Sequence, residues 1–188
     1  MHSNVVSPSG SHSALRSRGG PWLAGNTIGT CERAERVYGR SLKHYLPDDF
    51  QAMCDMTELR LWSCNDSEIP HLLWHLERLE TLEVCRSQRL ESVPASIGRL
   101  KRLRNLSFSG CTALLKISDE IGRLDSLQVL DLSHCLRLQS VPYSVRYLHQ
   151  LRCLDLRGCN SLRFAPESSQ LPATCEVRLP RHLLSAIC

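Results

Sequence analysis

A 24-residue period constrains the fold of this 188-residue chain more than any other feature. Four units share the pattern Leu-x-x-Leu-x-(Leu, Val or Phe), and they start at Leu79, Leu103, Leu127 and Leu151. Further apolar residues follow in each unit at matching offsets, commonly in the form Val-Pro-x-x-Ile-Gly-x-Leu. A unit that is one residue shorter starts at Met56, and a partial unit covers 175–179. Five units in phase exclude a chance repeat.

The first part of each unit predicts a short strand, because apolar residues alternate there with period two. The leucines would point inward, and the residues between them would point outward. The later apolar positions would turn the chain back along the other side as short helical or irregular segments. No single unit can close a core of its own, so neighbouring units must stack to bury a continuous one. The period therefore predicts a solenoid.

The period also accounts for four of the ten cysteines. Cys64, Cys111, Cys135 and Cys159 occupy the ninth position of their units, and Ser87 occupies it in the remaining one. The chain bends inward at this position, which favours a small, weakly polar side chain that meets the backbone of the adjacent unit. We therefore expect these five residues to be structural.

The full motif, L-x-x-L-x-L-S-x-C-x-x-L-x-x-V-P-x-x-I-G-x-L, resembles the intracellular leucine-rich repeats of plant resistance proteins and Ras-group-related proteins. It is equally similar to the plant-like repeats of type III effectors from bacterial plant pathogens. The resemblance covers residues 56–180. It implies an α/β fold, a curved right-handed solenoid with a concave parallel sheet of about five 23–24-residue repeats. It also implies protein recognition on that sheet.

The flanks differ from the repeats. Residues 1–30 contain six Ser, five Gly and no acidic residue, which predicts a disordered leader. Its composition is similar to the secretion segments of type III effectors, to organellar transit peptides and to an ordinary terminus. Ala34, Tyr38, Leu42 and Tyr45 follow helical spacing, so we expect residues 31–55 to form a helical N-terminal cap. Residues 181–188 would form a C-terminal cap.

The concave face is expected to carry the partner-binding residues, at the outward positions of the strands. The candidates are Arg60, Trp62, Glu83, Asn105, Ser107, Asp131, Asp155 and Arg157. Trp and Arg dominate protein interfaces, so Trp62 is the strongest single candidate, unless the N-terminal cap covers it. Asp131 and Asp155 would lie side by side on adjacent strands, and a cationic group of a partner could relieve their repulsion. Alternatively, Asp at this position serves the repeat itself, with Arg157 or Arg178 neutralising the pair.

Other arrangements suggest chemistry less strongly. His71 and His75 have the spacing of two metal ligands on a helix, but no Glu accompanies them, so we expect no metal and no cofactor. The outward Cys85 or Cys153 could act as a nucleophile only with a base such as His134 within hydrogen-bond reach. The basic run 99–104 is interrupted by leucines of the repeat, which favours a solvated connection over a nucleic-acid site.

The sequence therefore predicts a non-enzymatic protein-binding module, with no nucleic-acid partner and as a monomer. It lacks a G-x-x-x-x-G-K-[ST] motif and any apolar stretch of the roughly 18 residues that a membrane span needs. We expect a bacterial effector that acts in the cytoplasm of a host cell. The alternatives are a plant intracellular signalling or immune protein in the cytoplasm, a thiol-dependent enzyme, or the recognition part of a ubiquitin ligase whose catalytic domain is absent.

Overall fold

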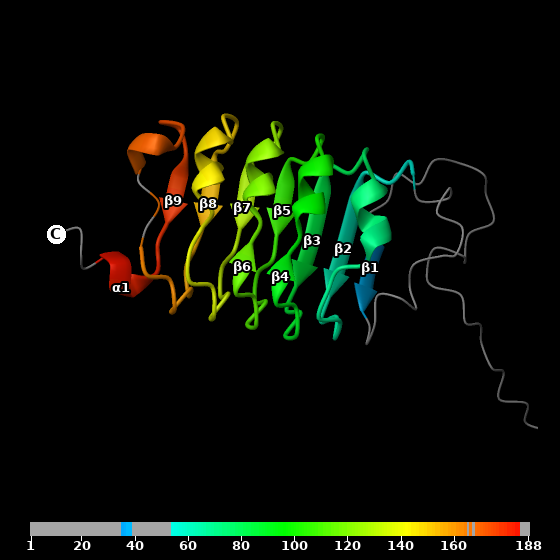
Figure 1. Cartoon of the computed structure of the whole chain (residues 1–188), viewed down its shortest axis with the longest axis horizontal. Helices are drawn as coiled ribbons and strands as arrows, with labels where there is room; N and C mark the ends of the chain where they lie inside the picture. Colours follow the sequence, from blue (N-terminus) through cyan, green and yellow to red (C-terminus); the bar gives the residue numbers. More distant parts are fainter. Residues whose placement is uncertain (1–34, 39–53, 165, 167, 185–188) are drawn as a thin grey trace, which may run out of the picture.

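The computed structural model describes the backbone of residues 35–38 together with residues 54–164, 166 and 168–184. Their main feature is a seven-stranded parallel sheet with strand order β1-β2-β3-β5-β7-β8-β9 (Figure 1). The strands are β1 (Glu35–Tyr38), β2 (Glu58–Trp62), β3 (Thr81–Cys85), β5 (Asn105–Ser107), β7 (Val129–Asp131), β8 (Cys153–Asp155) and β9 (Glu176–Arg178). Each strand pairs with the strand of the next unit, so the sheet grows along the chain without crossovers.

The strand register reproduces the sequence period. Leu82 pairs with Leu106, Leu106 with Leu130, and Leu130 with Leu154, which are steps of 24 residues. The steps into β3 and into β9 are each one residue shorter. The prediction of a parallel sheet, with the partial unit at 175–179 in phase, is confirmed.

The other side of the solenoid consists of short 3-10 helices, as the apolar spacing predicts. They are η4 (His71–His75), η5 (Ala95–Arg99), η6 (Asp119–Arg123), η7 (Tyr143–Tyr147) and η8 (Ser168–Gln170). Between the two sides, β4 (Ser92–Val93) pairs with β6 (Lys116–Ile117). The helices stack alongside one another in the same order as the strands (Figure 1).

Glycine in the Ile-Gly-x-Leu segment permits this stacking. A Cβ atom on Gly98 would lie 2.9 Å from the carbonyl oxygen of Glu120 in η6, and one on Gly122 would lie 2.6 Å from that of Ser144 in η7. Real Cβ atoms do not approach backbone oxygen so closely. Any larger residue at these two positions would therefore push adjacent units apart.

One continuous core lies between the sheet and the helices. The leucines that define the units, including Leu79, Leu103, Leu127 and Leu151, are 0% exposed. Trp74 and Phe108 are the largest fully buried side chains. Each buried leucine contributes about 1.5–3 kcal/mol relative to an exposed one, so the core stabilises the solenoid over its whole length.

The expected helical cap over residues 31–55 is wrong for Glu35–Tyr38, which form β1. This segment pairs in parallel with β2, from Glu35 opposite Leu59 to Tyr38 opposite Trp62. The edge of β2 offers a row of backbone donors and acceptors, and pairing with them outweighs the helical spacing of the side chains. Residues 31–34 and 39–53 lie outside the described residues, as does the expected leader, 1–30.

At the other end, β9 completes the sheet and α1 (Arg181–Leu184) follows it. The remaining residues of the expected C-terminal cap, 185–188, lie outside the described part of the chain. Among the described residues, no helix has the length and apolar character that a membrane span requires.

Candidate functional site

Three of the four ninth-position cysteines bind the backbone of the preceding unit, whereas the thiol of Cys64 lies 4.0 Å from the carbonyl oxygen of Trp62 in its own unit. The thiols of Cys111, Cys135 and Cys159 donate to the carbonyl oxygens of Val84, Phe108 and Leu132 at 3.0, 3.2 and 3.0 Å. Each of these thiols lies 0% exposed. Burial raises the pKa of Cys159 to about 11 and that of Cys111 to about 12. These thiols are therefore protonated hydrogen-bond donors between units and not nucleophiles.

The residue before each of these positions adopts a left-handed backbone conformation. The five residues are Ser63 (φ 54°), Arg86 (φ 55°), Gly110 (φ 73°), His134 (φ 59°) and Gly158 (φ 74°). Only glycine adopts this conformation without strain, yet three of the five carry side chains. The fold therefore directs the side chains of Arg86 and His134 outward from the turn that follows the strand.

The concave face is more tightly filled than the sequence suggests. In β2 the outward residues Glu58, Arg60 and Trp62 are half-buried and alternate with buried leucines. In the middle of the sheet, Cys85 is 7% exposed and Asp155 is 5% exposed. Neighbouring outward side chains shield one another, because the short strands bring them close together.

The middle outward position of the strand has a local structural role. The side chains of Ser107, Asp131 and Asp155 accept hydrogen bonds from the backbone N–H two residues later, at 3.2, 2.9 and 3.0 Å. These bonds satisfy donors at the point where each strand ends. The interpretation that Asp at this position serves the repeat therefore holds for Asp131 and for Asp155.

Beyond this shared role, the two aspartates differ in their ionic partners. Arg157 binds Asp155 with Nη2 at 2.6 Å from Oδ2, and Nη1 of Arg178 lies 3.6 Å from the same oxygen. Burial raises the pKa of Asp155, but the side-chain and backbone hydrogen bonds from Arg157 outweigh it and lower that pKa overall. Asp131 accepts from the hydroxyl of Ser107 at 3.2 Å and forms no ion pair among the described residues.

A hollow of about 410 Å³ opens on the concave face between β2 and β7. It brings together five of the eight predicted binding residues: Trp62, Glu83, Asn105, Ser107 and Asp131. Arg60 lies beside it and pairs with Glu83, its Nε 3.0 Å from Oε1. Asp155 ends the next strand, β8, and Arg157 follows it; neither residue lines the hollow.

The hollow is also lined by Cys85, which the sequence suggested only as a possible nucleophile, and by Arg86 and Ser109, which were not among the predicted binding residues. The guanidinium of Arg86 lies over the Trp62 ring, 5.8 Å from its centroid, and restricts the position of that ring. Arg86 stands at the repeat position that Gly110 and Gly158 occupy in later units. Because glycine recurs at this position, the sequence could have indicated that Arg86 lies in the turn after the strand.

The two alternative chemical sites are poorly supported. Burial raises the pKa of Cys85 and that of Cys153, which is the opposite of what an activated thiol requires. The rings of His71 and His75 lie 4.9 Å apart on η4. However, no group of three or more His, Cys, Asp or Glu residues within the described ranges could hold a metal ion.

The comparisons with known proteins agree with this geometry. A family model described as Leucine Rich Repeat matches residues 126–148. The leucine-rich-repeat domain of the type III effector XopL is similar in structure, with a TM-score of 0.50 and 24% identity over 81% of this chain and 70% of that chain. A leucine-rich-repeat protein of Leptospira interrogans gives a TM-score of 0.54 and 24% identity, over 72% of this chain and 40% of that chain. No curated protein matches the sequence.

The fold and the repeat define the class of protein: a solenoid with a parallel sheet on one side and short helices on the other. More specifically, the fold is that of a leucine-rich-repeat solenoid, and residues 126–148 match the leucine-rich-repeat family model. The solved structures are less than 25% identical to it, so they establish the fold and leave the partner open.

Proposed function

We propose that the protein is a binding module that holds a partner protein on its concave face and catalyses no reaction of its own. Leucine-rich-repeat solenoids generally bind proteins, and the hollow between β2 and β7 supplies a defined place for contact. Trp62 offers a large, half-buried aromatic surface at one end of it, and aromatic residues of this kind dominate binding energy at interfaces.

The observation that carries the proposal is the charge state of the hollow. Two carboxylates line it, and Arg60 compensates only Glu83. Asp131 forms no ion pair among the described residues, although Arg86 lines the same hollow and Arg157 attracts Asp131 electrostatically, and its two hydrogen bonds hold the carboxylate in place. A carboxylate that is held in place without an ion pair is complementary to a lysine or arginine side chain, and the Trp62 ring, three strands away at the other end of the hollow, offers a further contact. The partner would place such a side chain between Trp62 and Asp131.

The test compares two Asp→Asn variants in affinity capture from a plant-cell lysate, with quantitative mass spectrometry as the readout. Asp131→Asn removes the charge but keeps an oxygen that can accept from the backbone N–H of Ser133. We expect it to reduce capture of the partner at least fivefold, as we expect for Trp62→Ala. Asp119→Asn makes the same change on η6, on the opposite side of the solenoid, and should leave capture unchanged.

The contrary results are equally clear. If Asp131→Asn and Asp119→Asn capture the same proteins in the same amounts, the concave hollow is not the binding site. If both variants lose capture equally, the amount of captured partner depends only on the overall charge of the protein.

We also propose that the protein is a bacterial effector that acts inside a host cell. The Ser- and Gly-rich, acid-free composition of residues 1–30 supports it, as does the similarity of the repeat to that of the type III effector XopL. The chain would be fused to an adenylate cyclase reporter and expressed in a bacterium that secretes type III effectors into host cells. We expect the level of cyclic AMP in the host cells to rise, and we expect deletion of residues 2–30 to abolish this rise. No signal from the full chain would favour a plant intracellular protein instead.

A further inference from the structure

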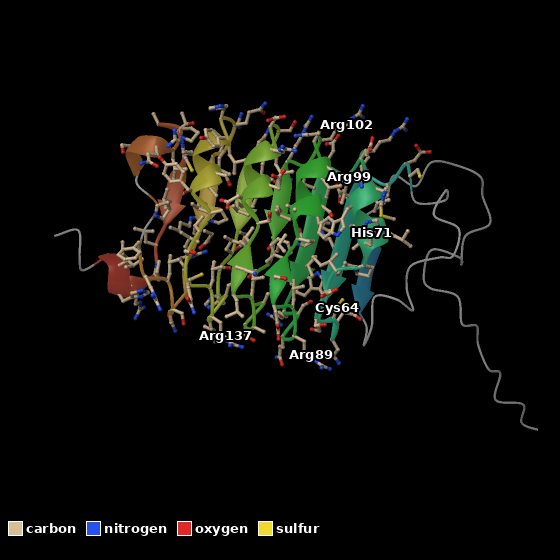
Figure 2. The ribbon with its side chains drawn as sticks, in the orientation of Figure 1. Cys64, His71, Arg89, Arg99, Arg102 and Arg137 are labelled. Carbon is tan, nitrogen blue, oxygen red and sulfur yellow. The ribbon has the colours of Figure 1, made fainter. Side chains whose placement is uncertain are left out.

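A second charged surface lies along the edge of the solenoid where the chain leaves the strands. We define this loop edge by the segments that follow β3, β5, β7 and β8: 86–91, 110–115, 134–139 and 158–163. The segment after β2, which contains Asp66 and Glu68, borders it at the N-terminal end. The last three segments contain no Asp or Glu. Arg89 and Arg137 lie on this edge, and Arg99 and Arg102 lie on the opposite one (Figure 2).

The arginines of the loop edge lack acidic partners. Arg86, Arg89, Arg137 and Arg163 are exposed and form no ion pair among the described residues. On the opposite edge, three cations are paired: Arg78 with Asp55, Lys101 with Asp125 and Arg104 with Glu80. The loop edge therefore carries a positive charge that the protein itself does not neutralise.

At its C-terminal end, the loop edge runs into a hollow of about 820 Å³ beside α1. The polar side chains that line it are Arg157, Arg181, His134, His182 and Asn160, and no Asp or Glu is among the lining residues. Asp155 holds the Arg157 guanidinium in place while 60% of that side chain stays exposed. Arg181 forms no ion pair within the described part of the chain.

The local packing fixes two of these groups. A Cβ atom on Gly158 would lie 2.5 Å from Nδ1 of His134, so the imidazole ring lies directly over the glycine backbone. Nε2 of His182 donates to the carbonyl oxygen of Leu162 at 2.8 Å, which joins α1 to the last loop segment. The hollow thus presents hydrogen-bond donors from two chain segments, and such a set is suited to binding carboxylates.

From these observations we infer that the loop edge is a second binding surface, which takes an extended acidic segment of a partner protein. The segments 86–91 and 158–163 lie three strand spacings apart, about 14–15 Å. An extended peptide of roughly four to five residues spans this distance, and its Glu or Asp side chains would meet the arginines and end in the hollow. Nucleic acid fits less well, since no Phe, Tyr or Trp lines the hollow and Asp155 pairs with Arg157 at its rim.

The test measures binding of a fluorescein-labelled decaglutamate peptide by fluorescence polarisation at low salt. We expect the double variant Arg137→Glu/Arg181→Glu to bind at least tenfold more weakly than the unchanged protein. The matched control, Arg99→Glu/Arg102→Glu, changes the net charge by the same amount on the opposite edge and should remain within about twofold. Thermal unfolding of both variants checks that the fold is kept.

Three results would overturn the inference: no binding of decaglutamate by the unchanged protein, equal losses in the two double variants, or tighter binding of a decathymidine oligonucleotide than of decaglutamate. Asp131→Asn should leave decaglutamate binding unchanged. The proposals for this surface and for the concave hollow can therefore be supported or refuted independently.

Discussion

At the residue scale, Asp155 shows how one side chain joins local structure and charge. It accepts from the backbone N–H of Arg157 at the end of β8, and it forms ion pairs with Arg157 and Arg178. Its buried position would favour the neutral acid, and the hydrogen bonds from Arg157 reverse that preference. The lowered pKa means that folding favours the ionised form, so Asp155 stabilises the protein most where it is charged in both states.

We therefore expect Asp155→Asn to reduce the free energy of unfolding by about 1–3 kcal/mol at pH 7. The pKa of Asp155 in the folded protein is below its unfolded value of about 3.9, so the contribution is complete above about pH 5. It is lost as the pH falls through the folded pKa, and the two proteins should converge in stability there. Denaturant unfolding from pH 7 down to pH 2 measures this.

Asp125→Asn is the control for that measurement, because Asp125 is exposed and its carboxylate lies 3.7 Å from Lys101. Exposed pairs contribute little, so the loss should stay below about 1 kcal/mol. A stability difference between Asp155→Asn and the unchanged protein that persists undiminished at pH 2 would contradict the account.

The sequence predicted some residues better than others. The ninth-position cysteines could be placed because they recur in phase with the leucines, and three of them, Cys111, Cys135 and Cys159, bind the backbone of the adjacent unit. The left-handed conformation of the residues before them was not predicted: Gly110 and Gly158 mark the position, but Ser63, Arg86 and His134 carry no sign of it in their own residue type. The strain at those positions arises from tertiary packing, which composition and spacing do not report.

At the element scale, the repeat correctly predicted the strands and the short helices. The prediction was wrong at β1, on one edge of the sheet. Strands β2, β3, β5, β7 and β8 follow directly from the alternation of leucines with outward residues. The segment Glu35–Tyr38 shows no such alternation, and it is a strand because β2 offers an unpaired edge. Helical spacing in a single sequence cannot reveal a neighbour of that kind.

The stacking of the helices depends on Gly122, which gives a direct test. Gly122→Ala should reduce the free energy of unfolding by about 1–3 kcal/mol, because the new methyl group would overlap the Ser144 carbonyl oxygen. Gly98→Ala should cost less, since the corresponding distance is 2.9 Å rather than 2.6 Å. Thermal unfolding monitored by circular dichroism ranks the two. Unchanged or increased stability in Gly122→Ala would show that the helices are not held this closely.

At the scale of the whole molecule, the solenoid separates two kinds of surface. The concave hollow carries the carboxylate of Asp131, and the loop edge carries Arg89, Arg137 and Arg163; none of these four groups forms an ion pair among the described residues. The outward positions could be listed from the sequence, and five of the eight lie in the hollow. Their arrangement in space could not be predicted from the sequence. The pairing of Arg60 with Glu83 and of Arg157 with Asp155 depends on the geometry of the side chains.

The central claim is that the concave hollow contacts the partner, and site-specific photo-crosslinking tests it most directly. A benzoylphenylalanine at Asn105, which is exposed and lines the hollow, would be compared with one at Ala95, which is exposed on η5 on the other side. Both proteins would be irradiated in a plant-cell lysate. We predict one crosslinked partner from position 105, lost on Asp131→Asn, and none from position 95. Equal crosslinking from both positions, or a partner crosslinked only from position 95, would contradict the account.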